Sequence, residues 1–185
     1  MRGASWAFLL LGCAAYAVAP RRAAAAAGPS EYDVKAAFLY NFARYIEWPP
    51  DGLPPQGEAF VFTVLGDDAF AESLEGVLRG KTTHERRLTV RRVARAEDVG
   101  RSQILFIGES ESEDLPRILR RLETAPVLTV GDSERFAERG GMIRFRKERE
   151  RVGFDINLAS AERARLKISS QLLKLGRIVA AGSRG

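Results

Sequence analysis

The stretch AFVFTVLGDD, residues 59–68, decides the fold class that this sequence predicts. Residues 59–65 form an unbroken run of apolar and β-branched residues, which is typical of a strand buried on both faces. Gly66 and the two aspartates after it then turn the chain into a helix expected over residues 69–79, with an Asp as its cap. A buried strand that leads directly into a helix is the repeating unit of a parallel α/β sheet.

The same pattern recurs farther along the chain. Residues 103–107 and 126–130 predict two more buried strands, and residues 87–93 alternate as a half-buried strand does. Ser110 and Glu113 fit a capping box, which would open a helix between two of these strands. Because strands that are apolar on both faces need cover on both faces, the sequence predicts a three-layer α/β/α sandwich with a mostly parallel sheet.

The C-terminal part has a different pattern. Residues 142–146 and 152–157 alternate cleanly and are joined by a charged segment, which predicts an antiparallel β-hairpin. A short helix is expected just before this hairpin. The chain closes with a terminal helix from about residue 158, either continuous or broken near Lys167.

The composition is that of a globular protein: of 185 residues, 45% are hydrophobic and 29% are charged. This excludes a mostly disordered or collagen-like chain. The formal net charge is +5, but residues 1–27 contain Arg2, Arg21 and Arg22 and no acid, so much of the excess belongs to this leader. The sequence pI of about 9.7 is therefore weak evidence for nucleic-acid binding, and we expect no nucleic-acid partner.

Residues 1–27 read as a signal peptide followed by a linker. Arg2 precedes an apolar stretch that falls short of the about 20 residues needed to span a bilayer, and Pro20 ends that stretch. Small residues predict cleavage between Ala17 and Ala27.

Residues 28–185 are then expected to form a single exported domain in the periplasm. The sequence Leu-Leu-Gly-Cys that ends at Cys13 offers a less favoured alternative, a lipid anchor on that cysteine. An uncleaved membrane anchor is a further, less favoured alternative. The domain would lie outside the cytoplasm in each case.

Cysteine and histidine each occur once, as Cys13 and His84. This rules out an internal disulfide, a thiolate metal cluster and a two-histidine metal site, and it disfavours a Ser-His-Asp triad. The segment GVLRGKT at 76–82 has the wrong glycine spacing for a phosphate loop, and GESES at 108–112 lacks the second glycine of a nucleophile elbow. We therefore predict no catalytic residues, no metal, no cofactor and no enzymatic activity, with His84 solvated in a polar loop.

Charged residues gather at two further places. Asp67, Asp68 and residues 109–114 follow predicted strands, where carboxylates either hold Mg²⁺ or cap helices; capping needs no ion and is favoured. The hairpin carries five basic residues near its tip: Arg144, Arg146, Lys147, Arg149 and Arg151. Two glutamates interrupt them and no aromatic residues are interleaved, so the tip is either a solvated charged hairpin or a contact for an anionic partner.

The terminal helices supply the candidate interaction surfaces. Apolar spacing predicts a first helix from residue 31 to near Trp48, capped by Ser30. Tyr40 lies off the apolar face of this helix, so Tyr40 and Trp48 are candidate aromatic anchors for a partner. The terminal helix has an apolar stripe with Leu173 beside it, which is typical of a dimer seam. The alternative for both helices is that they simply pack on the sheet.

Three motifs in order resemble the YfiR family, and they extend over about residues 31–180. They are VKAAFLYNF at 34–42 with IEWP at 46–49, PVLTVGD at 126–132 with FA at 136–137 and GGMI at 140–143, and VGFDIN at 152–157 with LKISSQLL at 166–173.

The resemblance implies an exported α/β protein that works by binding. In this family the expected action is repression of a membrane-bound diguanylate cyclase through its periplasmic part, which lowers cyclic-di-GMP and biofilm formation. An outer-membrane-anchored sequestering protein and a homodimer are also implied. The chain departs from the best-understood member in having no cysteine in the mature domain, so redox control does not carry over.

Two other functions remain as alternatives. A periplasmic small-ligand-binding module would use the strand ends near Gly66, Gly108 and Gly131 as its pocket. A hydrolase is disfavoured, because the sequence provides no nucleophile–base pair.

Overall fold

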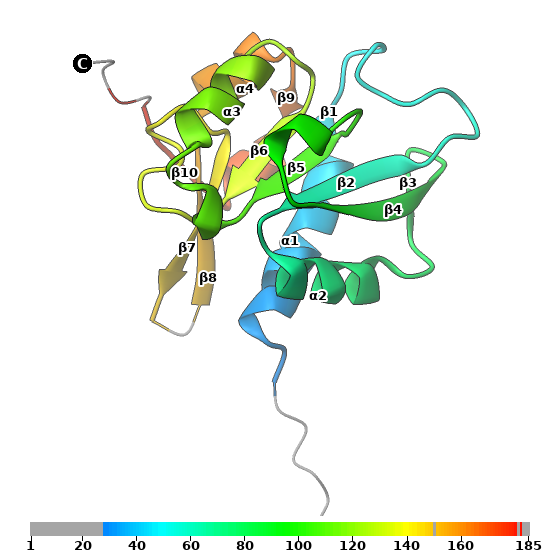
Figure 1. Cartoon of the computed structure of the whole chain (residues 1–185), viewed down its shortest axis with the longest axis horizontal. Helices are drawn as coiled ribbons and strands as arrows, with labels where there is room; N and C mark the ends of the chain where they lie inside the picture. Colours follow the sequence, from blue (N-terminus) through cyan, green and yellow to red (C-terminus); the bar gives the residue numbers. More distant parts are fainter. Residues whose placement is uncertain (1–27, 150, 181, 183–185) are drawn as a thin grey trace, which may run out of the picture.

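The computed structural model describes residues 28–149, 151–180 and 182 (Figure 1). The predicted signal peptide, Cys13 and the cleavage window from Ala17 to Ala27 lie outside these residues. Within the described ranges, no helix is long and apolar enough to cross a membrane.

Five α-helices and ten strands make up the described part of the chain. The helices are α1 (Glu31–Tyr45), α2 (Asp68–Leu78), α3 (Leu115–Leu122), α4 (Leu158–Arg163) and α5 (Ser170–Leu173), with 3₁₀ turns η1 (Ala96–Asp98) and η2 (Glu109–Glu111). The strands are β1 (Ile46–Glu47), β2 (Phe60–Leu65), β3 (Thr82–Thr83), β4 (Arg86–Val93), β5 (Ile104–Ile107), β6 (Leu128–Gly131), β7 (Ile143–Glu148), β8 (Arg151–Ile156), β9 (Lys167–Ile168) and β10 (Arg177–Ile178).

The main sheet has the strand order β10-β8-β7-β6-β5-β2-β4-β3. Strands β4, β2, β5, β6 and β7 run parallel to one another, and β8 turns back antiparallel to β7 as the predicted hairpin. Figure 1 shows this hairpin projecting from the body of the molecule at the same end as the N-terminus of α1.

Two hydrophobic clusters lie on opposite faces of the sheet, which confirms the three-layer sandwich. Strand β5 contributes to both, since Ile104 and Phe106 belong to the cluster under α1 and α2, whereas Leu105 and Ile107 belong to the cluster under α3. This alternation follows from the two-residue period of a strand. A strand covered on both faces has no solvent-facing positions, which is why residues 104–107 are all apolar.

The first helix forms as the sequence predicts but ends earlier. Ser30 caps α1 in a reciprocal capping box with Asp33. The helix ends at Tyr45 because Ile46 and Glu47 leave it to pair with Ile168 and Lys167 in a separate two-stranded ribbon.

The helix predicted to be capped by Ser110 instead has its cap position four residues later, at Asp114. Ser110 lies in η2, and its hydroxyl donates a hydrogen bond to the carbonyl of Gly66 at 3.0 Å. Helix α3 starts after Asp114 with a proline in its first turn, where the missing N–H costs nothing. The capping-box prediction is therefore wrong, because Ser110 is used to join the ends of β2 and β5. The short helix expected after β6 is replaced by turns.

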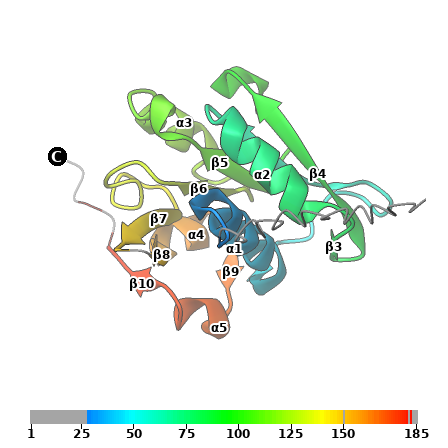
Figure 2. The same cartoon turned by 90° about the horizontal axis from the view of Figure 1, so that it is seen from below.

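The predicted terminal helix is divided into two short helices, α4 and α5, with strands β9 and β10 after them. The pairing of β9 with β1 makes the first interruption, near the position where the sequence suggested a break. The second comes at Gly176, where an added Cβ would lie 2.5 Å from the Phe154 ring, because the chain passes close against β8. Figure 2 shows this tail passing beside α1, and Ser169 N–H donates to the carbonyl of Tyr45 at 3.0 Å.

Candidate functional site

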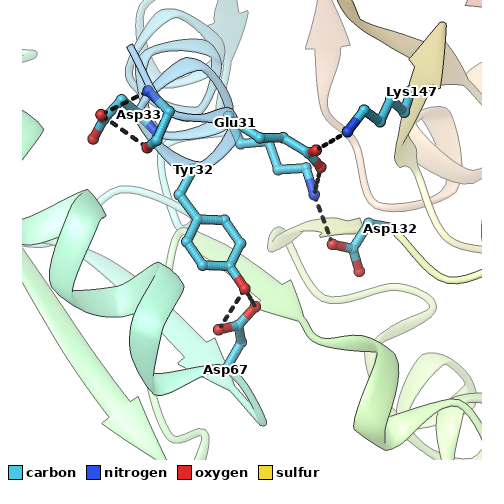
Figure 3. Close-up of polar contacts among 8 residues, drawn as sticks. Glu31, Tyr32, Asp33, Asp67, Asp132 and Lys147 are labelled. Atoms are coloured by element: carbon cyan, nitrogen blue, oxygen red, sulfur yellow. Dashed lines mark hydrogen bonds and ion pairs between the residues drawn. The ribbon is translucent and has the colours of Figure 1, made fainter. Parts of the chain in front are cut away.

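Helix α1 is tied to the carboxyl ends of two parallel strands by polar contacts of its first turns (Figure 3). The Tyr32 hydroxyl donates to Asp67, which follows β2, at 3.2 Å. The Lys35 ammonium donates to Asp132, which follows β6, at 2.9 Å. Because parallel strands end at the same edge of a sheet, one helix N-terminus reaches both acids.

Lys35 lies at the centre of this polar cluster. It is 6% exposed and forms ion pairs with Glu31 and Asp132, both at 2.9 Å. Burial lowers the pKa of Lys35, but the hydrogen bonds to Glu31 and Asp132 outweigh it and hold this pKa above its ordinary value. Glu31 also pairs with Lys147 of the hairpin at 3.2 Å. The hydrogen bond from Lys35 chiefly lowers the pKa of Glu31, so this carboxylate stays ionised.

Asp67 acts as a helix cap. Its carboxylate accepts the N–H of Phe70 at 2.9 Å, at the start of α2, as well as the Tyr32 hydroxyl. Burial first, and then the Asp67 charge, raise the pKa of Tyr32, which keeps this phenol protonated as a donor. Within the described residues, no group of three or more His, Cys, Asp or Glu side chains is placed to hold a metal ion. These contacts position α1 and do not place a nucleophile beside a base.

The glycines at the strand ends, where the small-ligand alternative places its pocket, are closely packed. A Cβ on Gly108 would lie 2.8 Å from the Gly66 carbonyl oxygen, and a Cβ on Gly131 would lie 2.5 Å from the Phe136 ring. The chain therefore uses these glycines for close packing of backbone and ring. A cavity of about 200 Å³ remains beside them, lined mostly by charged residues that include Lys35, Glu109 and Asp132. In this fold class ligands bind at such strand ends, so the small-ligand function stays an alternative.

A groove opens between α1 and the α1-facing side of the hairpin, with a volume of about 460 Å³. Its walls come from the start of α1 and the outer half of the hairpin: Pro29, Glu31, Val34, Phe38, Lys147, Arg151 and Val152. Phe38 is half-buried, with its ring centroid 5.3 Å from that of Phe154. We refer to these seven residues as the hairpin groove.

The basic residues of the hairpin have different environments. Asp155 on β8 is fully buried, and its carboxylate pairs with Arg146 of β7 and Arg177 of β10, each at 2.9 Å. Arg146 therefore joins β7 to β8 and is not part of a solvated tip, whereas Arg177 joins β10 to β8 from outside the hairpin. Lys147 and Arg151 are exposed at the rim of the hairpin groove. Contact with an anionic partner therefore stays an alternative for this part of the hairpin.

Tyr40 is half-buried on the outer side of α1. Its hydroxyl donates to the Thr82 carbonyl at 3.3 Å, and the charged groups of Arg44 and Lys81 lie 5.7 and 5.5 Å from its ring centroid. The ring retains exposed surface, so its role as an anchor stays a prediction.

Trp48 requires a correction, since it is 7% exposed and belongs to the core. Its ring meets Phe60 edge-on at 5.3 Å and lies 6.0 Å from His84. It is buried because α1 ends at Tyr45 and the chain then bends inward as β1. The expectation of an exposed Trp48 anchor is wrong. His84 is likewise half-buried, with its Nε2 2.9 Å from the Ala43 carbonyl oxygen, and is not a solvated loop residue.

The tail exposes residues other than the one predicted. Leu173 is half-buried and packs against the main cluster, whereas Leu175 and Ile178 are 71% and 57% exposed. The division of the terminal helix causes this difference, because it removes the stripe that would have aligned these side chains. A dimer seam in the tail stays a prediction, with Leu175 and Ile178 as its better candidates.

Sequence reasoning missed the hairpin groove and the burial of Lys35. The spacing of Glu31 and Lys35 indicates an ion pair on one helix face, but an exposed pair has the same spacing. Only the docking of α1 onto the strand ends distinguishes the two cases.

Comparison with protein families matches residues 32–177 to the family described as YfiR/HmsC-like. The chain belongs to this family. The match extends from the first turn of α1 to the start of β10, so it includes most of the polar cluster, of the hairpin groove and of the tail; Pro29 and Glu31 lie just before it. Family membership indicates a periplasmic regulator of cyclic-di-GMP signalling, in a family whose members are regulatory and not catalytic. A comparison with curated proteins finds no match.

Proposed function

We propose that residues 28–185, after removal of the leader, form a periplasmic repressor of a membrane-bound diguanylate cyclase. The repressor would contact the periplasmic part of the cyclase and hold it inactive. The family match over residues 32–177 carries this proposal, because it spans nearly the whole folded unit.

The physical features of the domain support a function in binding. Lys35 of the polar cluster is held in ion pairs with Glu31 and Asp132, and the glycines at the strand ends are closely packed. The described surface includes a groove beside α1 and exposed apolar side chains on the tail. Grooves and apolar surface patches of this kind are used in protein–protein contacts.

The assembly we propose has three parts. The domain forms a homodimer through its tail, engages the cyclase through another surface, and is released when an outer-membrane-anchored protein sequesters it. Tyr40 is a candidate for the cyclase surface, because its ring lies partly exposed on the outer side of α1.

The experiment is deletion of the gene followed by measurement of cyclic-di-GMP in cell extracts. Deletion is expected to raise cyclic-di-GMP, and expression of the exported wild-type protein is expected to restore the original level. Co-purification of the mature domain with a diguanylate cyclase from detergent-solubilised membranes identifies the target. Unchanged cyclic-di-GMP after deletion would contradict the proposal.

A further inference from the structure

The floor of the hairpin groove is apolar and comes from two elements. Val34 and Phe38 lie one turn apart on α1, so they share one face of the helix. Val152 lies across from them on β8, and all three are only half-buried. The core continues below, where Phe38 stacks on Phe42 at 6.1 Å. The groove is therefore the open end of the core beneath α1, where the projecting hairpin extends past the other strands.

The rim of the groove is positively charged. Lys147 and Arg151 are both exposed there, at the end of the hairpin. Among the described lining residues the one acid is Glu31, which already pairs with Lys35 at 2.9 Å and with Lys147 at 3.2 Å. Glu148, opposite Arg151 in the hairpin, pairs with Arg146. An apolar floor between cationic walls is complementary to an apolar side chain flanked by carboxylates.

The chain's own leader does not have this chemistry. Residues 1–27 contain three arginines and no acid, so the Lys147 and Arg151 charges would repel them. The occupant that the charges favour is a segment of another protein.

We propose that the hairpin groove is a docking site for an acidic segment of a partner protein, which inserts an apolar side chain between α1 and the hairpin. The apolar side chain contacts Val34, Phe38 and Val152, and neighbouring carboxylates of the segment pair with Lys147 and Arg151. The inference deepens the proposed function by assigning a surface and a chemistry to the partner, and it rests on that function only for the identity of the partner.

The test uses three short fluorescent peptides and the purified mature domain. The first contains Phe residues among Glu residues, the second replaces each Glu with Lys, and the third replaces each Phe with Ser. The first peptide is expected to bind at least about tenfold more tightly than either of the others, measured by fluorescence anisotropy at low salt. Equal binding of the three peptides would overturn the proposal.

Variants of the domain locate the site. Arg151→Glu reverses a rim charge, and Val34→Trp fills the groove with a larger ring. Each is expected to weaken binding of the acidic peptide by about tenfold or more. The matched controls are Arg101→Glu, at an exposed arginine before β5, and Ala37→Trp, at an exposed position of the same helix. Both controls are expected to bind as the wild type does, and thermal melting verifies that every variant is folded.

A folded Arg151→Glu protein that binds the acidic peptide as tightly as the wild type would exclude the groove. If Arg101→Glu and Ala37→Trp also lose peptide binding, the binding site lies elsewhere on the domain. Light scattering tests whether the groove holds a second copy of the domain. If the wild type is a dimer and Val34→Trp is a monomer, the groove is a dimer interface and the proposal is overturned. The peptide measurements contain no cyclase, so they stand even if deletion of the gene leaves cyclic-di-GMP unchanged.

Discussion

At the scale of single residues, Lys35 has the most constrained environment in the polar cluster. Its ammonium group is buried and shared between two carboxylates from different elements, Glu31 of α1 and Asp132 after β6. A buried charge is tolerated only when it is paired, and removal of a partner leaves an uncompensated ion. The cluster therefore fixes the position of α1 on the sheet, and so fixes the width of the hairpin groove beside it.

Glu31 links this cluster to the hairpin, and its contribution depends on pH. The pKa of Glu31 lies below its ordinary value of 4.5, chiefly because of the hydrogen bond from Lys35. A lowered folded-state pKa gives stability that is present above the unfolded-state pKa and is lost as the pH falls through the folded-state pKa. The side chain is 39% exposed, so solvent screening keeps the ion pair weak, at about 0.5 kcal/mol.

We predict that Glu31→Gln lowers the free energy of unfolding by about 0.5 kcal/mol at pH 7 and low salt. The difference from the wild type should shrink as the pH falls below 4.5 and should be smaller in high salt. Urea denaturation at a series of pH values measures it. A difference that grows toward acid pH would contradict the assignment.

A larger loss of unfolding free energy is predicted for a substitution at Trp48. Trp48→Ala is expected to reduce the free energy of unfolding by about 3 kcal/mol or more, because it leaves a cavity beside Phe60 in the core. Tyr40→Ala, which truncates a half-buried ring, is the control and should cost distinctly less. Denaturant unfolding compares the two. Equally small losses of unfolding free energy in Trp48→Ala and Tyr40→Ala would indicate that Trp48 is not packed as described.

At the scale of elements, the tail shows how pairing overrides helix propensity. The segment after Asn157 has helical spacing, yet β9 pairs with β1 and β10 pairs with β8. Each pairing satisfies backbone groups at an otherwise open position, and close contact at Gly176 excludes the helical path. The consequence is that Leu175 and Ile178 face solvent while Leu172 is buried.

Substitutions in the tail distinguish residues of a dimer seam from residues of the core. Leu175→Glu combined with Ile178→Glu is expected to leave the domain folded and to convert a homodimer into a monomer. Leu173→Glu is expected to destabilise the fold, because that side chain packs against the core cluster. Light scattering and thermal melting measure both properties. A doubly substituted protein that is still dimeric would exclude the tail as the seam.

At the scale of the whole molecule, the domain is held together by two core layers without any cross-link. The sequence contains no cysteine after Cys13, so its stability comes from packing on both faces of the sheet. Such a core needs no oxidising compartment to form. We therefore expect the periplasm to matter for contact with the proposed partner and not for folding.

We therefore predict that residues 28–185 produced without the leader fold in the cytoplasm. The melting temperature should be the same with and without a thiol reductant. The same protein should fail to lower cyclic-di-GMP in cells of the deletion strain, whereas the exported form should succeed. Repression by the leaderless protein would show that contact with the target does not require export.

The sequence by itself determined the layers of this protein. Strands buried on both faces have no solvent-facing positions, so the largely apolar run at residues 59–65 and its two counterparts predicted a parallel sheet with helices on both sides, as found. The cap of α1 by Ser30 was equally predictable, because a capping box involves residues only three apart. Both are local patterns, and local patterns can be read from neighbouring residues.

The tertiary structure alone decided which surfaces are available. The Glu31–Lys35 spacing did not reveal that Lys35 would be buried against Asp132, 97 residues away. Trp48 is hidden because β1 pairs with β9, and the hairpin groove exists because the hairpin extends past the strands that α1 covers. Each of these outcomes depends on contacts between segments far apart in the chain, and the pairing of such segments is fixed only when the sheet and helices pack together.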